Sequence, residues 1–88
     1  MQTLVENPKN KERAIQLARE FAQAQHIQLG PLSTAHFIDK TNQFGVRRIR
    51  WCIEFYPKSG PIKYRDIELM NIFFVDCRTE KVEKFFDR

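Results

Sequence analysis

The chain has 88 residues, of which 42% are hydrophobic and 30% are charged, so it has room for one domain with a modest core. This composition excludes a disordered tail, and no segment approaches the roughly 18 apolar residues that a membrane-spanning helix needs. Residues 6–8 read Glu-Asn-Pro where a signal peptide would be apolar, which predicts a cytoplasmic protein. The formal net charge of +4 arises mostly from Arg47, Arg48 and Arg50, a smaller basic cluster than a dedicated nucleic-acid-binding domain carries.

Residues 9–25 have the pattern of an amphipathic helix. Asn7 can cap the backbone N–H groups of the first turn, and Pro8 fits that turn because its missing N–H costs nothing there. The apolar residues fall within about half of the helical wheel, and the alanines among them permit close approach to a sheet. Gly30 and Pro31 then prevent the helix from continuing.

After the helix the apolar period changes from 3.6 to 2, which indicates strands. They are expected at residues 34–39, 46–56, 62–75 (as one strand or two pieces) and 82–86. In the second of these, Ile49, Trp51, Ile53 and Phe55 point to one face. A helix followed by strands with short turns predicts an α+β fold, with the helix packed on an antiparallel meander of three to five strands.

The other face of the second strand is predicted to bind a partner. Arg48, Arg50 and Tyr56 share that face with Cys52 and Glu54, so two cations and an aromatic ring lie in line. Arginine and aromatic residues are favoured at protein interfaces, which indicates an acidic protein partner. The same combination occurs in proteins that bind RNA or single-stranded DNA, although Glu54 interrupts the basic run.

Neither a metal nor another cofactor is predicted. His26 and His36 do not form, with each other or with a cysteine, the spacing of a zinc finger or of a helical metal site. Cys52 has no cysteine-hydrolase signature around it, and no enzymatic activity is predicted. Two cysteines are too few for a disulfide scaffold, so both are expected to be thiols.

The C-terminal part of the chain resembles a known group of domains. Residues 72–76 (Ile-Phe-Phe-Val-Asp) and 79–82 (Thr-Glu-Lys-Val) are similar to the strand, aspartate turn and returning strand of small bacterial domains of cystatin-like or NTF2-like shape. Residues 50–55 look like their W-x-V-x-F strand, and an alanine-rich helix precedes it. The group includes immunity proteins that neutralise toxins, and inhibitor-like domains. The resemblance therefore implies a bacterial protein of the short cystatin-like form with a binding or inhibitory role.

These observations predict a small protein-binding module, of the inhibitor or toxin-neutralising immunity type, that acts by covering its partner's site. Two alternatives remain open. The first is an NTF2-like domain that binds a small ligand or catalyses a reaction in a polar pocket between helix and sheet. The second is a single-stranded nucleic-acid binder, whose affinity would fall as salt rises.

A homodimer is also predicted. Residues 69–75 read Leu-Met-Asn-Ile-Phe-Phe-Val, which is apolar on both faces of a strand. A single helix covers one face, so Met70, Ile72 and Phe74 are expected to leave an apolar patch on the other. An identical patch on a second copy can pair with it about a twofold axis, through the sheet. The alternative covers are a folded-back C-terminal Phe85–Phe86, the N-terminal Leu4–Val5 or a permanent different partner.

Overall fold

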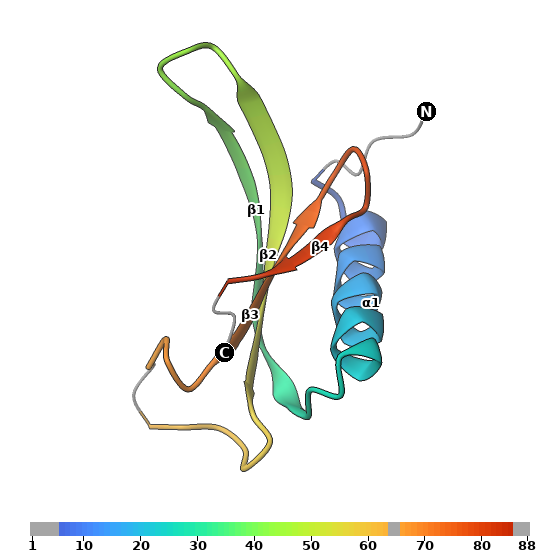
Figure 1. Cartoon of the computed structure of the whole chain (residues 1–88), viewed down its shortest axis with the longest axis vertical. Coiled ribbons are helices and arrows are strands. Elements are labelled where there is room, and N and C mark those ends of the chain that lie inside the picture. Colours follow the sequence, from blue (N-terminus) through green and yellow to red (C-terminus); the bar gives the residue numbers. More distant parts are fainter. Residues whose placement is uncertain (1–5, 64–65, 86–88) are drawn as a thin grey trace.

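The computed structural model describes residues 6–63 and 66–85, which form one helix and a four-stranded antiparallel sheet (Figure 1). Helix α1 is Pro8–Ala24, and the strands are β1 (Leu29–Thr41), β2 (Arg47–Pro57), β3 (Asn71–Asp76) and β4 (Val82–Lys84). The order in the sheet is β1-β2-β3-β4, so each strand pairs with its neighbour along the chain. The predicted α+β fold, a helix on an antiparallel meander, is confirmed.

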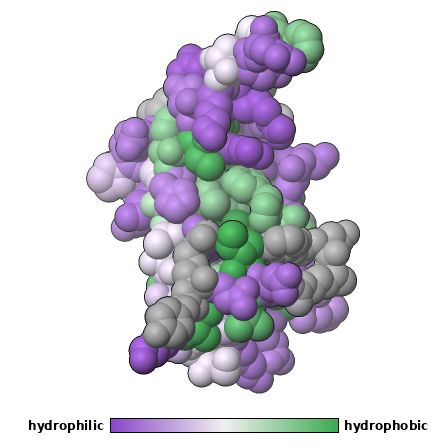
Figure 2. Space-filling model, turned by 90° about the vertical axis from the view of Figure 1, so that its left-hand side faces the viewer, coloured by the Kyte–Doolittle hydropathy of each residue, from purple (hydrophilic) through white to green (hydrophobic). Residues whose placement is uncertain are grey.

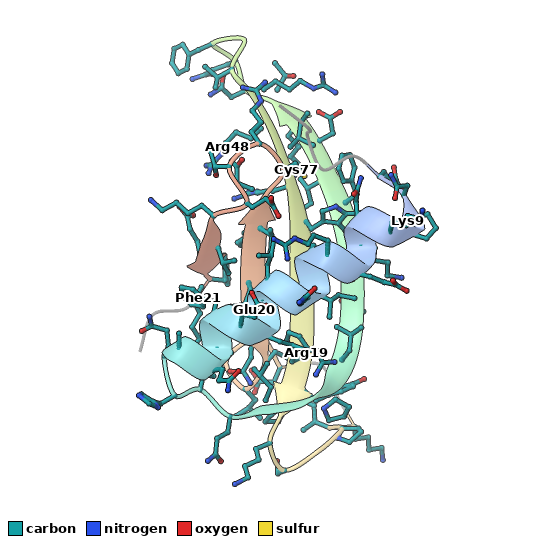
Figure 3. The ribbon with its side chains drawn as sticks, turned by 90° about the vertical axis from the view of Figure 1, so that its right-hand side faces the viewer. Lys9, Arg19, Glu20, Phe21, Arg48 and Cys77 are labelled. Atoms are coloured by element: carbon teal, nitrogen blue, oxygen red, sulfur yellow. The ribbon has the colours of Figure 1, made fainter. Side chains whose placement is uncertain are left out.

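Helix α1 begins at the predicted cap. The backbone N–H of Asn10 donates to the Asn7 side-chain oxygen at 3.0 Å, and Pro8 occupies the first turn. The buried residues of α1 are Ala14, Ala18 and Ala22, one small residue per turn on the face toward the sheet. Their size lets the helix lie close across the strands, as Figure 3 shows. The described part of the chain has no helix with the length and apolar character that crossing a bilayer requires.

The core fills the space between α1 and the sheet. Its largest fully buried side chains are Phe55, Phe73, Ile53, Val75 and Cys77. Trp51 is 4% exposed and meets Phe37 edge to face, with 5.5 Å between ring centroids. The prediction that Trp51, Ile53 and Phe55 are core residues is therefore confirmed, whereas Ile49 is only half-buried.

Strand β1 is longer than predicted and begins next to the end of β2. The register shifts between Leu29 and Leu32 and again between Leu32 and Thr34, as in a β-bulge. A Cβ atom at Gly30 would come within 2.1 Å of the Pro57 carbonyl oxygen. Only glycine fits this close approach of two backbones, so Gly30 allows the start of β1 to lie against the end of β2.

The strand predicted over residues 62–75 is wrong in its first part. Residues 62–63 and 66–70 of this range are not strand, β3 covers only Asn71–Asp76, and a turn precedes it. The Asp66 carboxylate accepts the N–H of Glu68 at 3.0 Å, and the Asp66 carbonyl accepts the N–H of Leu69 at 3.0 Å. These local hydrogen bonds compete successfully with strand pairing, which the apolar residues alone suggested.

The turn between β3 and β4 is built by Asp76, as predicted. Its Oδ1 accepts the backbone N–H of Arg78 at 2.8 Å and of Thr79 at 3.0 Å. Glu80 has a φ of 60°, in the left-handed region that favours glycine. The Glu80 carboxylate also accepts from Arg13 Nε at 2.9 Å, an exposed ion pair that joins this turn to α1.

Candidate functional site

The candidate site is the open face of the sheet, the face turned away from α1, together with the hairpin that continues it. Strand pairing sets its residues in rows across β1, β2 and β3. The rows are Lys40–Arg48, Ile38–Arg50–Asp76, His36–Cys52–Phe74 and Thr34–Glu54–Ile72. Figure 2 shows hydrophilic side chains at one end of this side of the molecule and a band of apolar ones near its middle.

The β1–β2 hairpin extends past the rest of the sheet. Strand β3 pairs with β2 only from Arg50 onward, while β1 and β2 stay paired as far as Thr41 and Arg47. Residues 39–49 therefore form a hairpin arm, which curves away from the other elements in Figure 1. This arm lies at one end of a molecule whose longest dimension is 39 Å.

The tip of the hairpin arm is an ordered turn. The Asn42 side-chain oxygen accepts the N–H of Phe44 at 2.8 Å and of Val46 at 3.0 Å. The N–H of Gly45 donates to the Asn42 carbonyl at 3.0 Å, and Gly45 has a φ of 78°, which suits glycine. Phe44 at the tip is 80% exposed and Val46 is 55% exposed. The turn thus holds an aromatic side chain in solvent at a fixed place.

The charges of the hairpin arm are one aspartate and three cations, Lys40, Arg47 and Arg48. The Arg47 guanidinium donates to both carboxylate oxygens of Asp39, at 2.9 and 2.6 Å. This hydrogen bonding lowers the pKa of Asp39 and, in turn, raises the pKa of Arg47. Lys40 and Arg48 are paired across the strands and exposed, so they carry the positive charge that the arm presents to solvent.

Arg50 differs from Arg48, although both were predicted as binding residues. It is half-buried, and its guanidinium carbon lies 4.1 Å from the centroid of the Phe74 ring. Its Nε atom is buried and has no hydrogen-bond partner within residues 6–63 and 66–85. The expectation that both arginines are exposed strand charges is therefore wrong for Arg50, which covers an aromatic ring.

Tyr56 lies at the other end of β2 and is half-buried against Met70 and Ile72. Eight residues separate it from Arg48, which corresponds to roughly 26 Å along an extended strand. The structure therefore brings Arg48 and Arg50 together but not Tyr56. The exposed aromatic residue on the same hairpin as the cations is instead Phe44. The sequence patterns do not single it out, because it stands alone in a polar turn.

The expected apolar patch is covered within the chain. Met70 and Ile72 are each 5% exposed and pack in a cluster with Cys52. Ile62, from the connection between β2 and β3, contacts this cluster, and Phe85 meets Phe74 edge to face at 5.7 Å between centroids. The exposure predicted for Met70 and Ile72 is therefore wrong, because the chain folds back over its own sheet.

The homodimer stays a prediction, which sedimentation equilibrium at micromolar concentration would test.

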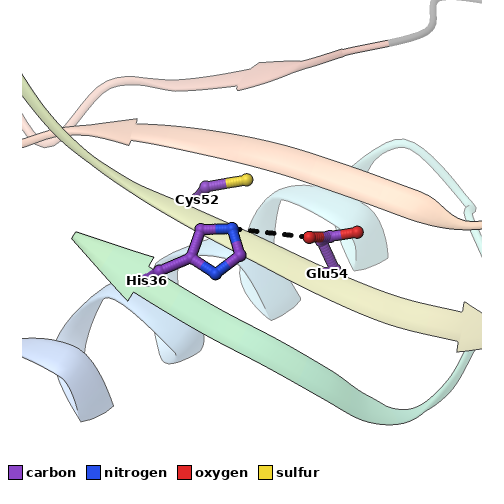
Figure 4. Close-up of side chains that lie close together, drawn as sticks. All are labelled: His36, Cys52 and Glu54. Atoms are coloured by element: carbon purple, nitrogen blue, oxygen red, sulfur yellow. Dashed lines mark ion pairs between the residues drawn. The ribbon is translucent and has the colours of Figure 1, made fainter. Parts of the chain in front are cut away.

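Three potential metal-ligating side chains meet in the middle of the open face (Figure 4). The ligand atoms of His36, Cys52 and Glu54 all lie within 4.8 Å of one another. His36 Nε2 is 3.5 Å from Glu54 Oε2, which also accepts from the Thr34 hydroxyl at 3.1 Å. Cys52 is 6% exposed and Glu54 is 2% exposed, whereas the His36 side chain is 53% exposed. The cluster thus has a buried floor and one side open to solvent.

The sequence patterns missed this cluster because no two of its members have a metal-site spacing in the chain. The strand period places Cys52 and Glu54 on one face, but it does not relate His36 to them. That relation depends on the register of the hairpin. A turn at Asn42–Gly45 pairs residues whose numbers sum to 88, which places His36 opposite Cys52.

The two cysteines lie on opposite faces of the sheet, so they cannot form a disulfide with each other. Both are thiols, with Cys52 on the open face and Cys77 in the core under α1. Burial raises the pKa of Cys77 to about 11, with smaller contributions from the negative charges of Asp76 and Asp39. Cys77 is therefore a protonated, inert core residue at neutral pH.

Asp76 is a further charged group on this face, beside Lys81 and Glu83. Desolvation acts to raise its pKa, but the N–H donors of Thr79 and Arg78, the Thr79 hydroxyl and the charge of Arg48 together lower it. Asp76 is therefore a stable carboxylate at neutral pH, occupied by its own turn. Catalytic use of Asp76 as a base would require the loss of that turn.

Comparison with known proteins gives no relative to reason from: no family model matches, and no curated protein or solved structure matches significantly. The resemblance to cystatin-like and NTF2-like domains stays an expectation from the sequence.

Proposed function

We propose that this chain is a small protein-binding module, without enzymatic activity, whose hairpin arm contacts an acidic surface of a partner protein. The observation that carries the proposal is Phe44, an aromatic side chain held 80% exposed at the tip of an ordered, projecting turn. A phenylalanine gains nothing in stability from such a position. Burial of this ring against a partner accounts for its exposure in the free chain.

The order of the tip supports tight binding. Three hydrogen bonds fix the backbone on either side of Phe44, two to the Asn42 side chain and one to its carbonyl. Association with a preformed loop costs less entropy than association with a loop that must first be ordered. Aromatic residues that enter a partner's pocket commonly dominate the energy of an interface.

The charge of the arm supports an acidic partner. Lys40 and Arg48 stand beside each other below the tip, while Arg47 is already paired with Asp39. Exposed cations around an apolar anchor steer association toward negative surfaces and disfavour positive ones. Such a module can inhibit by occlusion alone, which is how an inhibitor or immunity-type protein would act.

Two variants of the full chain test this proposal. In the first, Phe44→Ala is combined with Lys40→Glu and Arg48→Glu. In the control, Lys9→Glu and Lys58→Glu make the same change in charge at exposed positions off the arm. Each variant and the wild type serve as bait in a lysate of the source organism, and a captured protein is then purified and titrated. The arm variant should lose at least about tenfold in affinity and the control should not. Equal loss in both, or loss in neither, would contradict a role for the arm.

A single-stranded nucleic acid is the alternative partner for an aromatic ring flanked by cations. Titration with an oligo-dT and an oligo-U probe at two salt concentrations separates the two partners. Binding that depends on Phe44 and weakens steeply with salt would favour the nucleic acid. The small-ligand alternative has less support, because Phe55, Phe73 and Ile53 fill the centre of the space between α1 and the sheet. The hollow that remains on that side lies at the start of α1, where Lys11, Phe37 and Trp51 line it.

A further inference from the structure

We propose that His36, Cys52 and Glu54 form a metal site on the open face, which binds one Zn²⁺ ion or a similar divalent transition-metal ion. The site is separate from the hairpin arm and does not depend on the proposed function. It consists of one imidazole nitrogen, one thiolate sulfur and one carboxylate oxygen. These are the three kinds of ligand that zinc uses in proteins.

The backbone already places the three ligands. Cys52 and Glu54 are two residues apart on β2, so their side chains leave the same face, and His36 on β1 is directly opposite Cys52 in the register. All three stand on paired strands of the sheet. Sites on such elements hold their ligands more precisely than sites on loops do.

The distances between the ligand atoms are compatible with tetrahedral coordination of one ion. Bonds of about 2.0 Å to nitrogen and oxygen place two such ligand atoms roughly 3.3 Å apart at a tetrahedral angle. His36 Nε2 and Glu54 Oε2 are 3.5 Å apart, and no pair of ligand atoms in the cluster is further apart than 4.8 Å. A tetrahedral ion places the sulfur about 3.5 Å from the nitrogen and oxygen ligands, so rotations of the three side chains that shorten the longest separation close the set around one ion.

The surroundings supply an outer contact and an open side. The Thr34 hydroxyl donates to Glu54 Oε2 at 3.1 Å, the kind of hydrogen bond that orients a metal-bound carboxylate. Because the His36 side chain is 53% exposed, solvent or a small ligand can reach a fourth position. Three protein ligands with a fourth position open is the arrangement of zinc sites that bind water or a further ligand.

A simple ion pair explains the cluster less completely. Protonated His36 would satisfy Glu54, but such a pair does not require a thiol beside it. The position of Cys52, opposite His36 and two residues before Glu54 on a central strand, brings a soft thiol ligand within 4.8 Å of the ligand atoms of both. A metal ion accounts for all three side chains together, and its binding releases the thiol proton.

The test is a zinc titration of the reduced full chain against a chromogenic chelator, followed by Co²⁺ substitution. One zinc per chain is expected, and the cobalt form should show the ultraviolet charge-transfer band of a cobalt–thiolate bond. Cys52→Ser should lower zinc affinity more than roughly 100-fold and abolish the band, and His36→Gln should lower it at least about tenfold. Thr34→Val, which removes only the outer hydrogen bond, should cost about tenfold.

Two control variants decide whether the binding belongs to this site. His26→Asn removes the other histidine at a left-handed position that asparagine tolerates, and Cys77→Ala removes the thiol of the opposite face. Both should bind zinc as the wild type does, with the helix signal in circular dichroism confirming that each variant is folded. Absence of wild-type binding at about 100 μM zinc would overturn the proposal, as would equal affinity in Cys52→Ser or loss of binding in His26→Asn.

Discussion

The two faces of the sheet use alternate residues of the same strands, yet they differ in what they can do. On the covered face, Phe55 and Phe73 are 0% exposed and pack in one core with the buried alanines of α1. On the open face, the row that contains Cys52 and the row that contains Glu54 bring polar and apolar side chains together at the edge of solvent. A domain of this size has one face to spare for binding, because the other must supply nearly all of its stability.

The two cysteines, one on each face, show the same difference between the faces within one residue type. Cys77 lies among apolar side chains and the neighbouring carboxylates disfavour its thiolate, whereas Cys52 has an imidazole and a carboxylate within reach. The environment supplied by each face, and not the amino acid, decides whether a thiol is structural or chemical.

The largest difference should come from truncating an aromatic ring on each face. Phe55→Ala leaves a cavity under α1 and should lower the free energy of unfolding by about 3–5 kcal/mol. Phe74→Ala removes a half-buried ring and should cost about 2 kcal/mol. Chemical denaturation followed by Trp51 fluorescence measures both, since Trp51 is buried in the native chain. Equal costs would mean that the open face contributes as much to stability as the covered one.

The next difference is between two arginines of one strand. Arg50→Glu places a carboxylate against the Phe74 ring and removes the cation above it, which should cost about 2 kcal/mol. Arg48→Glu changes an exposed charge and should cost less than about 0.5 kcal/mol. Thermal unfolding of the two single variants compares them directly. A harmless Arg50→Glu change would return Arg50 to the set of exposed binding residues.

A third outcome concerns alkaline pH. The folded-state pKa of Cys77 is about 11 against an ordinary value of 9.0, since burial disfavours the thiolate. The stability gained from a protonated Cys77 is fully present below pH 9 and is lost as pH rises toward 11. The wild type should therefore lose stability faster than Cys77→Ala across this window in urea denaturation. Parallel curves for the two proteins would show that Cys77 does not titrate differently in the folded state.

The smallest expected effect is at the turn between β3 and β4. Glu80→Gly and Glu80→Ala both remove the exposed ion pair with Arg13, but only glycine relieves the positive φ. The glycine variant should be about 1 kcal/mol more stable than the alanine variant. Thermal melts of the two variants give this difference without a contribution from the lost ion pair. A more stable alanine variant would argue against strain at this position.

The sequence predicted those parts of the fold that depend on local patterns. The cap at Asn7, the apolar set with Trp51, and the turn at Asp76 each follow from a few neighbouring residues, and the structure contains all three. The failures share a different cause. The burial of Met70 and the half-burial of Arg50 depend on how distant segments cover the open face, which no periodicity records.

The candidate site shows the same limit. Arg48 and Arg50 were found because they share one strand, whereas His36 joins Cys52 only through pairing across the hairpin. Phe44 carries no pattern at all, since a single aromatic residue in a polar turn looks the same whether it is buried or exposed. The exposure of Phe44 depends on the projection of the hairpin arm beyond β3, which the sequence does not record.

The turn at the tip of the hairpin arm places a constraint on how this chain can change over time. Residues 42–45 set the pairing of β1 with β2, so one inserted or deleted residue there shifts every pair below it. One of the two strands would then turn its open-face residues toward α1, and His36 would no longer lie beside Cys52 and Glu54. Selection on this loop should therefore preserve its length even where its side chains vary, and distant descendants of the chain should differ at the tip by substitution rather than by insertion or deletion.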